Sequence, residues 1–122
     1  MASRITSVPS GGVQVIGLHG EFDVSTASTL AAALETAERH PRPFTVVDLG
    51  DTCFVDCATL DVLVSAARHH TARGGRLALA SARGTVARVL TLAGVGSECA
   101  VFASTGQTVR AMEQEQHLVP GG

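Results

Sequence analysis

Phe54-Val55-Asp56-Cys57-Ala58-Thr59-Leu60 is the stretch that decides the fold, because it joins an apolar segment to the start of a helix. Asp56 stands directly before an apolar pattern of helical period, and its short carboxylate can accept hydrogen bonds from the free N–H groups of a first turn. The apolar residues of that pattern recur at i, i+3, i+4 and i+7, and they are Leu60, Leu63, Val64 and Ala67. The sequence therefore predicts a helix from about 57 to 73, capped by Asp56 and ended by Gly74-Gly75.

Strands and helices alternate on both sides of this stretch. On the N-terminal side we expect a short edge strand around Ile5 and Val8, and then a strand over 13–18 that runs into Gly20-Glu21-Phe22-Asp23. A helix over about 25–39 should follow, capped by Ser25 or Thr26. After it we expect a buried strand over 44–49 and a loop from Gly50 to Val55. On the C-terminal side we expect a strand over 76–80, a short helix carrying Val86, Val89, Leu90 and Ala93, a strand over 100–102, and a polar helix with Val109 and Met112 facing inward. This order predicts an α/β fold whose sheet is mostly parallel, with right-handed crossovers.

The composition is that of one compact domain with an aliphatic core. The chain has 122 residues, 45% of them hydrophobic, and no Trp or Tyr. A second domain does not fit in this length, so we expect a single domain over 1–122, with a core from about 5 to 116 and a frayed tail from 117 to 122. The net charge is −2 and all nine basic residues are arginines without a run, which argues against a nucleic-acid surface.

Cysteine usage and hydropathy give an expected location. Cys53, Cys57 and Cys99 are an odd number at irregular spacing, which argues against a secreted disulfide framework and favours a reducing cytoplasm. No apolar stretch has the length of a signal peptide or approaches the roughly 18 residues of a membrane span. We therefore expect a soluble, cytoplasmic chain with no membrane insertion.

The helix start at Asp56 leaves two interpretations open. In the first, Asp56 only caps the helix. In the second, residues 57–59 form an exposed helix tip, where a phosphate on a hydroxyl would be tolerated and would change the surface by nearly two charges. Such a site would be a switch rather than a catalyst.

Catalytic and metal chemistry find little support in the sequence. Cys57 at a helix N-terminus could carry thiolate character, but a small buried cysteine is far commoner. Cys53 and Cys57, with His69-His70 later, match no strong zinc pattern. Neither a P-loop nor a nucleophile elbow occurs, and Glu21 and Asp23 are better explained as solvated loop acids than as a catalytic pair. We expect no enzyme activity, no cofactor and no bound metal.

Three stretches, in this order and spacing, resemble the anti-sigma factor antagonist branch of the STAS domain family: Gly20-Glu21-Phe22-Asp23, Val46-Val47-Asp48-Leu49 and the opening stretch from Phe54 to Leu60. The resemblance covers about 5 to 116 and implies a four- or five-stranded sheet packed with about four helices. It also implies a bacterial partner-switching role in signal transduction and transcription regulation. In that role the unmodified antagonist binds an anti-sigma factor that is also a serine kinase and so frees a sigma factor, whereas phosphorylation of the antagonist blocks binding. The residues that we then expect at the partner surface are Glu21, Asp23, Ser25, Thr52, Asp56, Cys57, Ala58, Thr59 and Asp61.

The chain departs from the family pattern at the phosphoacceptor. The family places a Ser or Thr two residues after the Asp, where this chain has Ala58, and Thr59 stands where the family usually has Gly. Either Thr59 is a substitute acceptor, or the protein is not switched by phosphorylation and stays in the binding-competent form. We favour the second, because a shift of one residue turns a side chain by about 100° around the helix.

Two further alternatives concern assembly. The chain could instead be a STAS scaffold or accessory subunit of a stress-signalling or lipid-transport complex, in which the same surface docks constitutively. An exposed edge strand at 4–8 could also pair two copies into a homodimer.

Overall fold

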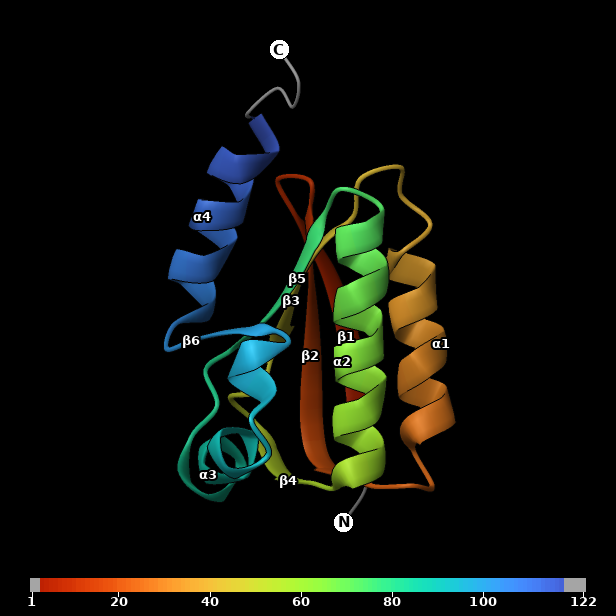
Figure 1. Ribbon diagram of the computed structural model, residues 1–122, viewed down its shortest axis with the longest axis vertical. Coiled ribbons are helices and arrows are strands. Elements are labelled where there is room, and N and C mark those ends of the chain that lie inside the picture. Colours follow the sequence, from red (N-terminus) through yellow and green to blue (C-terminus); the bar gives the residue numbers. More distant parts are fainter. Residues whose placement is uncertain (1–2, 118–122) are drawn as a thin grey trace.

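The computed structural model describes residues 3–117, which form a sheet covered by helices on both faces (Figure 1). The strands are β1 (Arg4–Ser10), β2 (Val13–Phe22), β3 (Phe44–Asp48), β4 (Thr52–Val55), β5 (Arg76–Ala80) and β6 (Ala100–Phe102). The helices are α1 (Ala27–Ala37), α2 (Cys57–Ala72), α3 (Gly84–Leu92) and α4 (Thr105–His117), with a short 3-10 turn, η1 (Val95–Ser97). These elements confirm the predicted α/β fold with four helices.

The sheet is mostly parallel, as predicted. Its main strand order is β1-β2-β3-β5-β6, and among the strands within residues 3–117 only β1 and β2 pair in an antiparallel manner. In the hairpin Arg4 pairs with His19 and Ser10 with Val13, so β1 lies at the outer edge of the sheet. Pairing of two copies through this edge stays a prediction.

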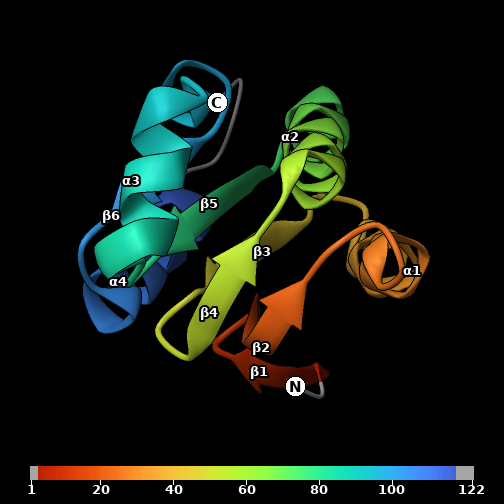
Figure 2. The ribbon, with the colours of Figure 1, turned by 90° about the horizontal axis from the view of Figure 1, so that it is seen from below.

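Two apolar clusters hold the helices on opposite faces of the sheet (Figure 2). The larger cluster lies under α1, α2 and α3, and its central side chains include Leu18, Leu30, Leu63 and Leu90. The smaller cluster lies under α4, where Val109 and Met112 pack on Phe44 and Val46 as the inward-facing pattern predicts. Because β3 and β5 are covered on both faces, the mostly apolar sequences of these two strands are explained.

Helix α2 is rotated relative to the predicted apolar face. Leu60, Leu63 and Ala67 are buried as expected, but Val64 is only half-buried. The centre of the buried face follows residues 59, 63, 66 and 70, so that two polar side chains, Thr59 and His70, are fully buried. The helix therefore presents its first-turn residues in an orientation that hydropathy alone did not predict.

His70 is a structural residue at the far end of α2 from Asp56. Its Nδ1 donates to the carbonyl of Ala66 at 2.9 Å, so its Nε2 accepts from the hydroxyl of Thr45 in β3 at 2.8 Å. Burial lowers the pKa of the His70 imidazole, against the opposing attraction of Glu38, whose carboxylate lies 3.9 Å from Nδ1. The neutral ring thus ties α2 to the central sheet.

Two predictions about element boundaries need correction, and a third falls outside the described residues. The segment expected to be a loop before Asp56 contains β4, which pairs with the end of β2. Helix α1 begins at Ala27, and Thr26, its N-cap residue, makes no side-chain capping bond because its hydroxyl bonds Asp23 instead. The expected frayed tail falls outside the described residues beyond His117, which is the last residue of α4.

Candidate functional site

The ends of β2 and β4 bring the first and last of the three motif stretches together. Glu21 pairs with Phe54 and Phe22 with Val55 in a parallel register, and the N–H of Asp56 donates to the carbonyl of Phe22 at 3.2 Å. The chain then leaves β2 toward α1 and leaves β4 toward α2, at the lower end of the molecule in Figure 1. The two loops that carry Asp23 and Asp56 therefore emerge side by side.

Asp56 is the N-cap of α2, as predicted. Its backbone is extended, and its Oδ1 accepts from the N–H of Thr59 at 3.0 Å and from the Thr59 hydroxyl at 3.1 Å. Both bonds use the same carboxylate oxygen, so the Thr59 side chain is held inward against the helix start. The cap fixes the position of the whole first turn.

The three residues after Asp56 differ sharply in exposure. Cys57 is exposed, Ala58 is half-buried and Thr59 has no exposed surface. The side chain that points to solvent at the tip is therefore the thiol of Cys57, directly after the capping Asp. No exposed hydroxyl lies on the first turn, 57–60, of α2.

The loop between β2 and α1 is locked by its own side chains. The Asp23 carboxylate accepts from the Ser25 hydroxyl at 2.6 Å and from the Ser25 N–H at 2.9 Å. These bonds, the hydroxyl first, hold the pKa of Asp23 below its usual value. Asp23 is thus an ionised group on a preformed turn, and Ser25 is exposed but bound to it.

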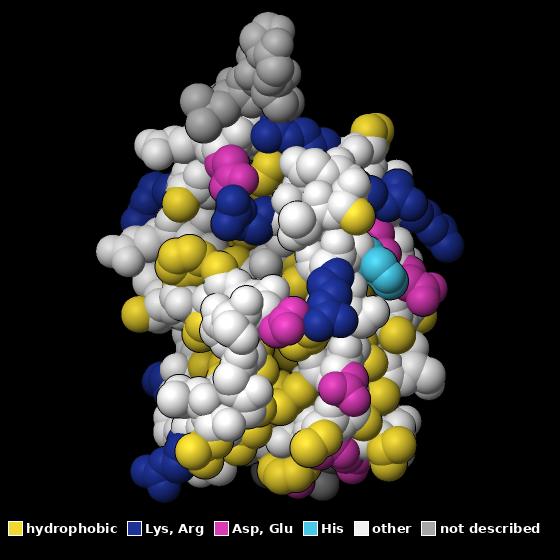
Figure 3. Space-filling model, in the orientation of Figure 1, with side chains coloured by type: hydrophobic (Ala, Val, Ile, Leu, Met, Phe, Trp, Pro, Cys, Tyr) yellow, Lys and Arg dark blue, Asp and Glu magenta, His cyan; other side chains and the backbone are white. Residues whose placement is uncertain are grey.

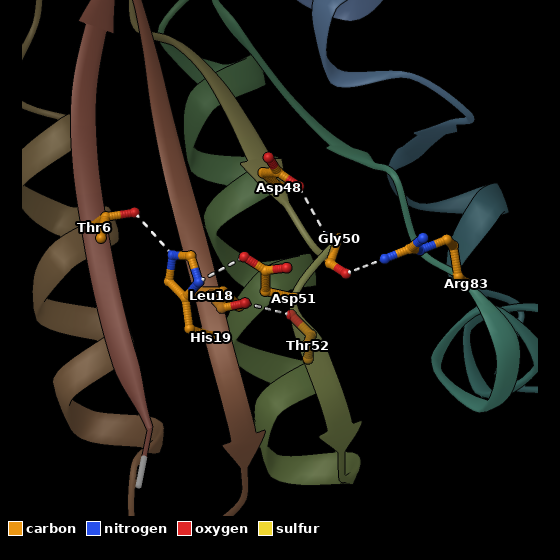
Figure 4. Close-up of polar contacts among 8 residues, drawn as sticks. All are labelled: Thr6, Leu18, His19, Asp48, Gly50, Asp51, Thr52 and Arg83. Atoms are coloured by element: carbon orange, nitrogen blue, oxygen red, sulfur yellow. Dashed lines mark hydrogen bonds and ion pairs between the residues drawn. The ribbon is translucent and has the colours of Figure 1, made fainter.

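A polar network fixes the loop that leads into β4 (Figure 4). The Thr52 hydroxyl donates to the carbonyl of Leu18 at 2.7 Å, and Asp51 lies 3.0 Å from Nδ1 of His19. On the other side of the loop, Arg83 donates to the carbonyl of Gly50 at 2.9 Å. Thr52, which we expected at the partner surface, is half-buried and its hydroxyl contacts the backbone of β2, so its observed contacts are structural.

Two apolar side chains at the same end were not among the predicted site residues. Val24, between Asp23 and Ser25, is 75% exposed, and Phe54 is 44% exposed. We call Glu21, Asp23, Val24, Phe54 and Cys57 the tip surface. Hydrophobic and acidic side chains lie next to one another at the lower end of the space-filling view (Figure 3). A Val between Asp23 and Ser25 and a Phe in the loop expected before Asp56 are apolar residues among polar neighbours, and these are the signals that sequence reasoning could have used.

The predicted residue Asp61 lies one turn beyond Cys57 on α2 and is exposed. None of the ion pairs among residues 3–117 involves Asp61. Its charge adds to those of Glu21 and Asp23, so the tip and the start of α2 form an acidic end of the molecule.

The described part of the chain offers no ready metal centre. Between residues 3 and 117 no group of three or more His, Cys, Asp and Glu side chains is arranged to hold an ion. Cys53 and Cys57 are exposed free thiols, whereas Cys99 is buried, and burial raises the pKa of its thiol to about 11. None of the helices over 3–117 is both long enough and apolar enough to cross a membrane.

Comparison with known proteins assigns the fold to a family. The family model described as "Mlab, STAS domain" matches residues 5–102, whereas no curated protein sequence matches the chain. An anti-sigma factor antagonist from Mycobacterium paratuberculosis shares the fold with a TM-score of 0.79 and 23% identity, over 91% of this chain and 94% of that one. The phosphorylated form of the Bacillus cell fate determinant SpoIIAA gives 0.66 and 20%, over 90% and 98% of the two chains.

The fold is also shared with a protein of a transporter family. A sulfate transporter family protein from Wolinella succinogenes has a TM-score of 0.75 at 18% identity, over 91% of this chain and 92% of that one. At these identities the structures share the fold, and the family model carries the assignment. The chain belongs to the STAS domain family.

Proposed function

We propose that the protein is an anti-sigma factor antagonist that binds an anti-sigma factor of the serine kinase type through its tip surface. The observation that carries this proposal is the preformed, exposed and acidic end built by Asp23, the capped start of α2, and the apolar side chains of Val24 and Phe54. Apolar side chains ringed by charge are typical of protein-binding surfaces. The fold shared with the antagonist from M. paratuberculosis agrees with this role.

The proposal includes no phosphorylation of the chain itself. Ala58 has no hydroxyl, and the Thr59 hydroxyl is buried and donates to Asp56, so a kinase would have to unwind the first turn of α2 to reach it. The fold of SpoIIAA, a relative whose phosphorylated form is known, is retained here. The surface would therefore stay in its binding form and depend on the amount of protein or on another signal. We place this activity in the cytoplasm, in agreement with the three free cysteines.

A displacement experiment tests this function. Each kinase-type anti-sigma factor of the same genome is purified in complex with its sigma factor, and the chain is titrated into the complex. Release of the sigma factor, followed by fluorescence anisotropy of a labelled sigma factor, is the expected result. If no complex releases its sigma factor at concentrations far above cellular ones, the antagonist role is wrong.

A second candidate is a constitutive subunit of a transport complex. The Mlab description of the family model and the fold shared with a sulfate transporter family protein favour it. Its partner would be a transporter component rather than an anti-sigma factor. Co-purification of the tagged chain with a transport ATPase, in the absence of any anti-sigma factor, is the outcome that would favour it.

A further inference from the structure

Hollows lie on both sides of α2. The first lies between α2 and the α3–η1 connection, has a volume of about 420 Å³, and runs from Cys57 to the ion pair of Arg68 with Glu98. The second lies between α1 and α2, has a volume of about 230 Å³, and its lining on α2 begins only at Asp61. Of these two hollows, only the first is continuous with the tip surface, because Cys57 lines the first hollow and is also part of the tip surface.

The first hollow is lined by apolar and by charged side chains. Its floor is formed by Leu60, Val64 and Val95, which are buried or half-buried, and the exposed residues Asp61, Arg68, Ala93 and Glu98 lie around its rim. In the space-filling view a hydrophobic band runs beside α2 toward a basic and an acidic side chain (Figure 3). Val95 and Leu60 are anchored in the core, so the floor is rigid.

The charged side chains at the rim differ in whether they already form an ion pair within the protein. Arg68 donates from Nε and Nη2 to the same carboxylate oxygen of Glu98, at 3.2 and 2.9 Å, so these two charges largely offset each other. Asp61, which lines both hollows, takes part in none of the ion pairs over residues 3–117, so the side of α2 is assigned from the continuity with Cys57 and not from this charge. The net charge that the hollow offers an incoming segment is therefore negative, and a basic group complements it.

From this continuity and this charge we infer that the hollow between α2 and η1 is a second contact site for the anti-sigma factor, filled by an apolar side chain of that partner with a Lys or Arg beside it facing Asp61. The inference rests on the proposed function and adds a direction to it. The partner extends from the tip along the α3 side of α2 and leaves the α1 side uncovered. Apolar anchors that fill a preformed pocket beside a charged rim carry much of the affinity of protein interfaces.

Paired tryptophan substitutions separate the two sides. Ala93 is exposed at the rim of the first hollow, and Ala31 lines the second. Binding of the purified anti-sigma factor is measured by calorimetry for wild type, Ala93→Trp and Ala31→Trp, with thermal melts to verify folding. Ala93→Trp should weaken binding by about tenfold or more, because it fills the site of an anchor, whereas Ala31→Trp should stay within about twofold of wild type.

Two further variants keep the test decisive. Val64→Gln puts an amide on the floor of the hollow and should also weaken binding. This variant tests the hollow independently if Ala93→Trp fails to fold. Asp61→Asn should reduce the salt dependence of binding, since it removes the charge that faces the basic group.

The failure of this inference is distinguishable from failure of the proposed function. If Val24→Arg at the tip abolishes binding while Ala93→Trp and Val64→Gln bind like wild type, the tip docks a partner and the hollow is not used. Equal losses in Ala93→Trp and Ala31→Trp contradict the assigned side. If wild type binds no anti-sigma factor, the antagonist role and the contact site are both wrong.

Discussion

Asp56 Oδ1 lies 3.0 Å from the backbone nitrogen of Thr59 and 3.1 Å from the Thr59 hydroxyl oxygen, so one carboxylate oxygen both caps α2 and satisfies a buried side chain. Removal of this carboxylate leaves two donors unpaired at the start of the helix. The cap is therefore a stability element as well as part of the candidate docking end.

Asp56→Ala should lower the free energy of unfolding by about 1 to 2 kcal/mol, because a cap is lost and the hydroxyl of Thr59 is left buried without its acceptor. Asp56→Asn keeps an acceptor oxygen and should cost clearly less. Urea denaturation of both variants measures the difference. Equal destabilisation by the two substitutions would mean that the cap geometry contributes nothing beyond the charge.

Position 57 should be a better phosphoacceptor than position 58. Cys57 is exposed and Ala58 half-buried, so a serine at 57 presents its hydroxyl to a kinase more fully than a serine at 58. Incubation of Cys57→Ser and Ala58→Ser with the cognate kinase and ATP, followed by phosphopeptide mass spectrometry, gives the two rates. We expect faster labelling of Cys57→Ser. Faster labelling of Ala58→Ser would support the alignment that places the family acceptor at 58.

Unfolding should depend on pH through His70. Burial lowers the pKa of this imidazole in the folded protein, so the unfolded chain binds the proton more readily. The free energy of unfolding should then be unaffected by His70 well above pH 6.5 and fall as the pH drops below that value, by up to about 1.4 kcal/mol per pH unit, until the folded-state pKa is reached.

The matched comparison is His70→Gln against wild type, with the slope of the unfolding free energy measured between pH 7.5 and 5. The removal of His70 should flatten the slope, although the loss of its bonds to Thr45 and Ala66 lowers stability at every pH. An unchanged slope in His70→Gln would show that other groups control the acid sensitivity.

Val24→Arg should weaken partner binding without loss of stability. The Val24 side chain is 75% exposed, so it contributes little to the core, but its loss from a docking surface removes an apolar contact and adds a large cation. We expect a decrease in affinity of about tenfold or more and an unchanged melting temperature. Val8→Arg is the control, since Val8 is 57% exposed on β1 outside the tip surface. Equal effects of the two variants would contradict the assigned surface.

Sequence patterns were sufficient for most of the fold because local and global signals agree. Asp56 before an apolar period, the Gly74 stop, and the short buried run at 44–48 each have one simple structural solution. Strand β4 was missed because four residues carry little periodicity, and they become a strand only through their pairing with Gly20 to Phe22, far away in the chain.

The candidate site was less accessible to sequence reasoning. Exposure around the first turn of α2 depends on how the helix rotates against β3, which the burial of His70 helps to set. Hence Thr59, a candidate acceptor from its residue type, is buried, and the outward position belongs to Cys57. Whether the predicted surface residues contact a partner stays a prediction.

The most direct measurement is intact-mass analysis of the chain after incubation with a purified kinase-type anti-sigma factor and ATP, with size-exclusion chromatography of the same mixture. The buried Thr59 hydroxyl and the absence of one at Ala58 predict a stable complex and a chain of unchanged mass. A chain that gains one phosphate on Thr59 and leaves the complex would contradict this, because it would make the protein a phosphorylation switch after all.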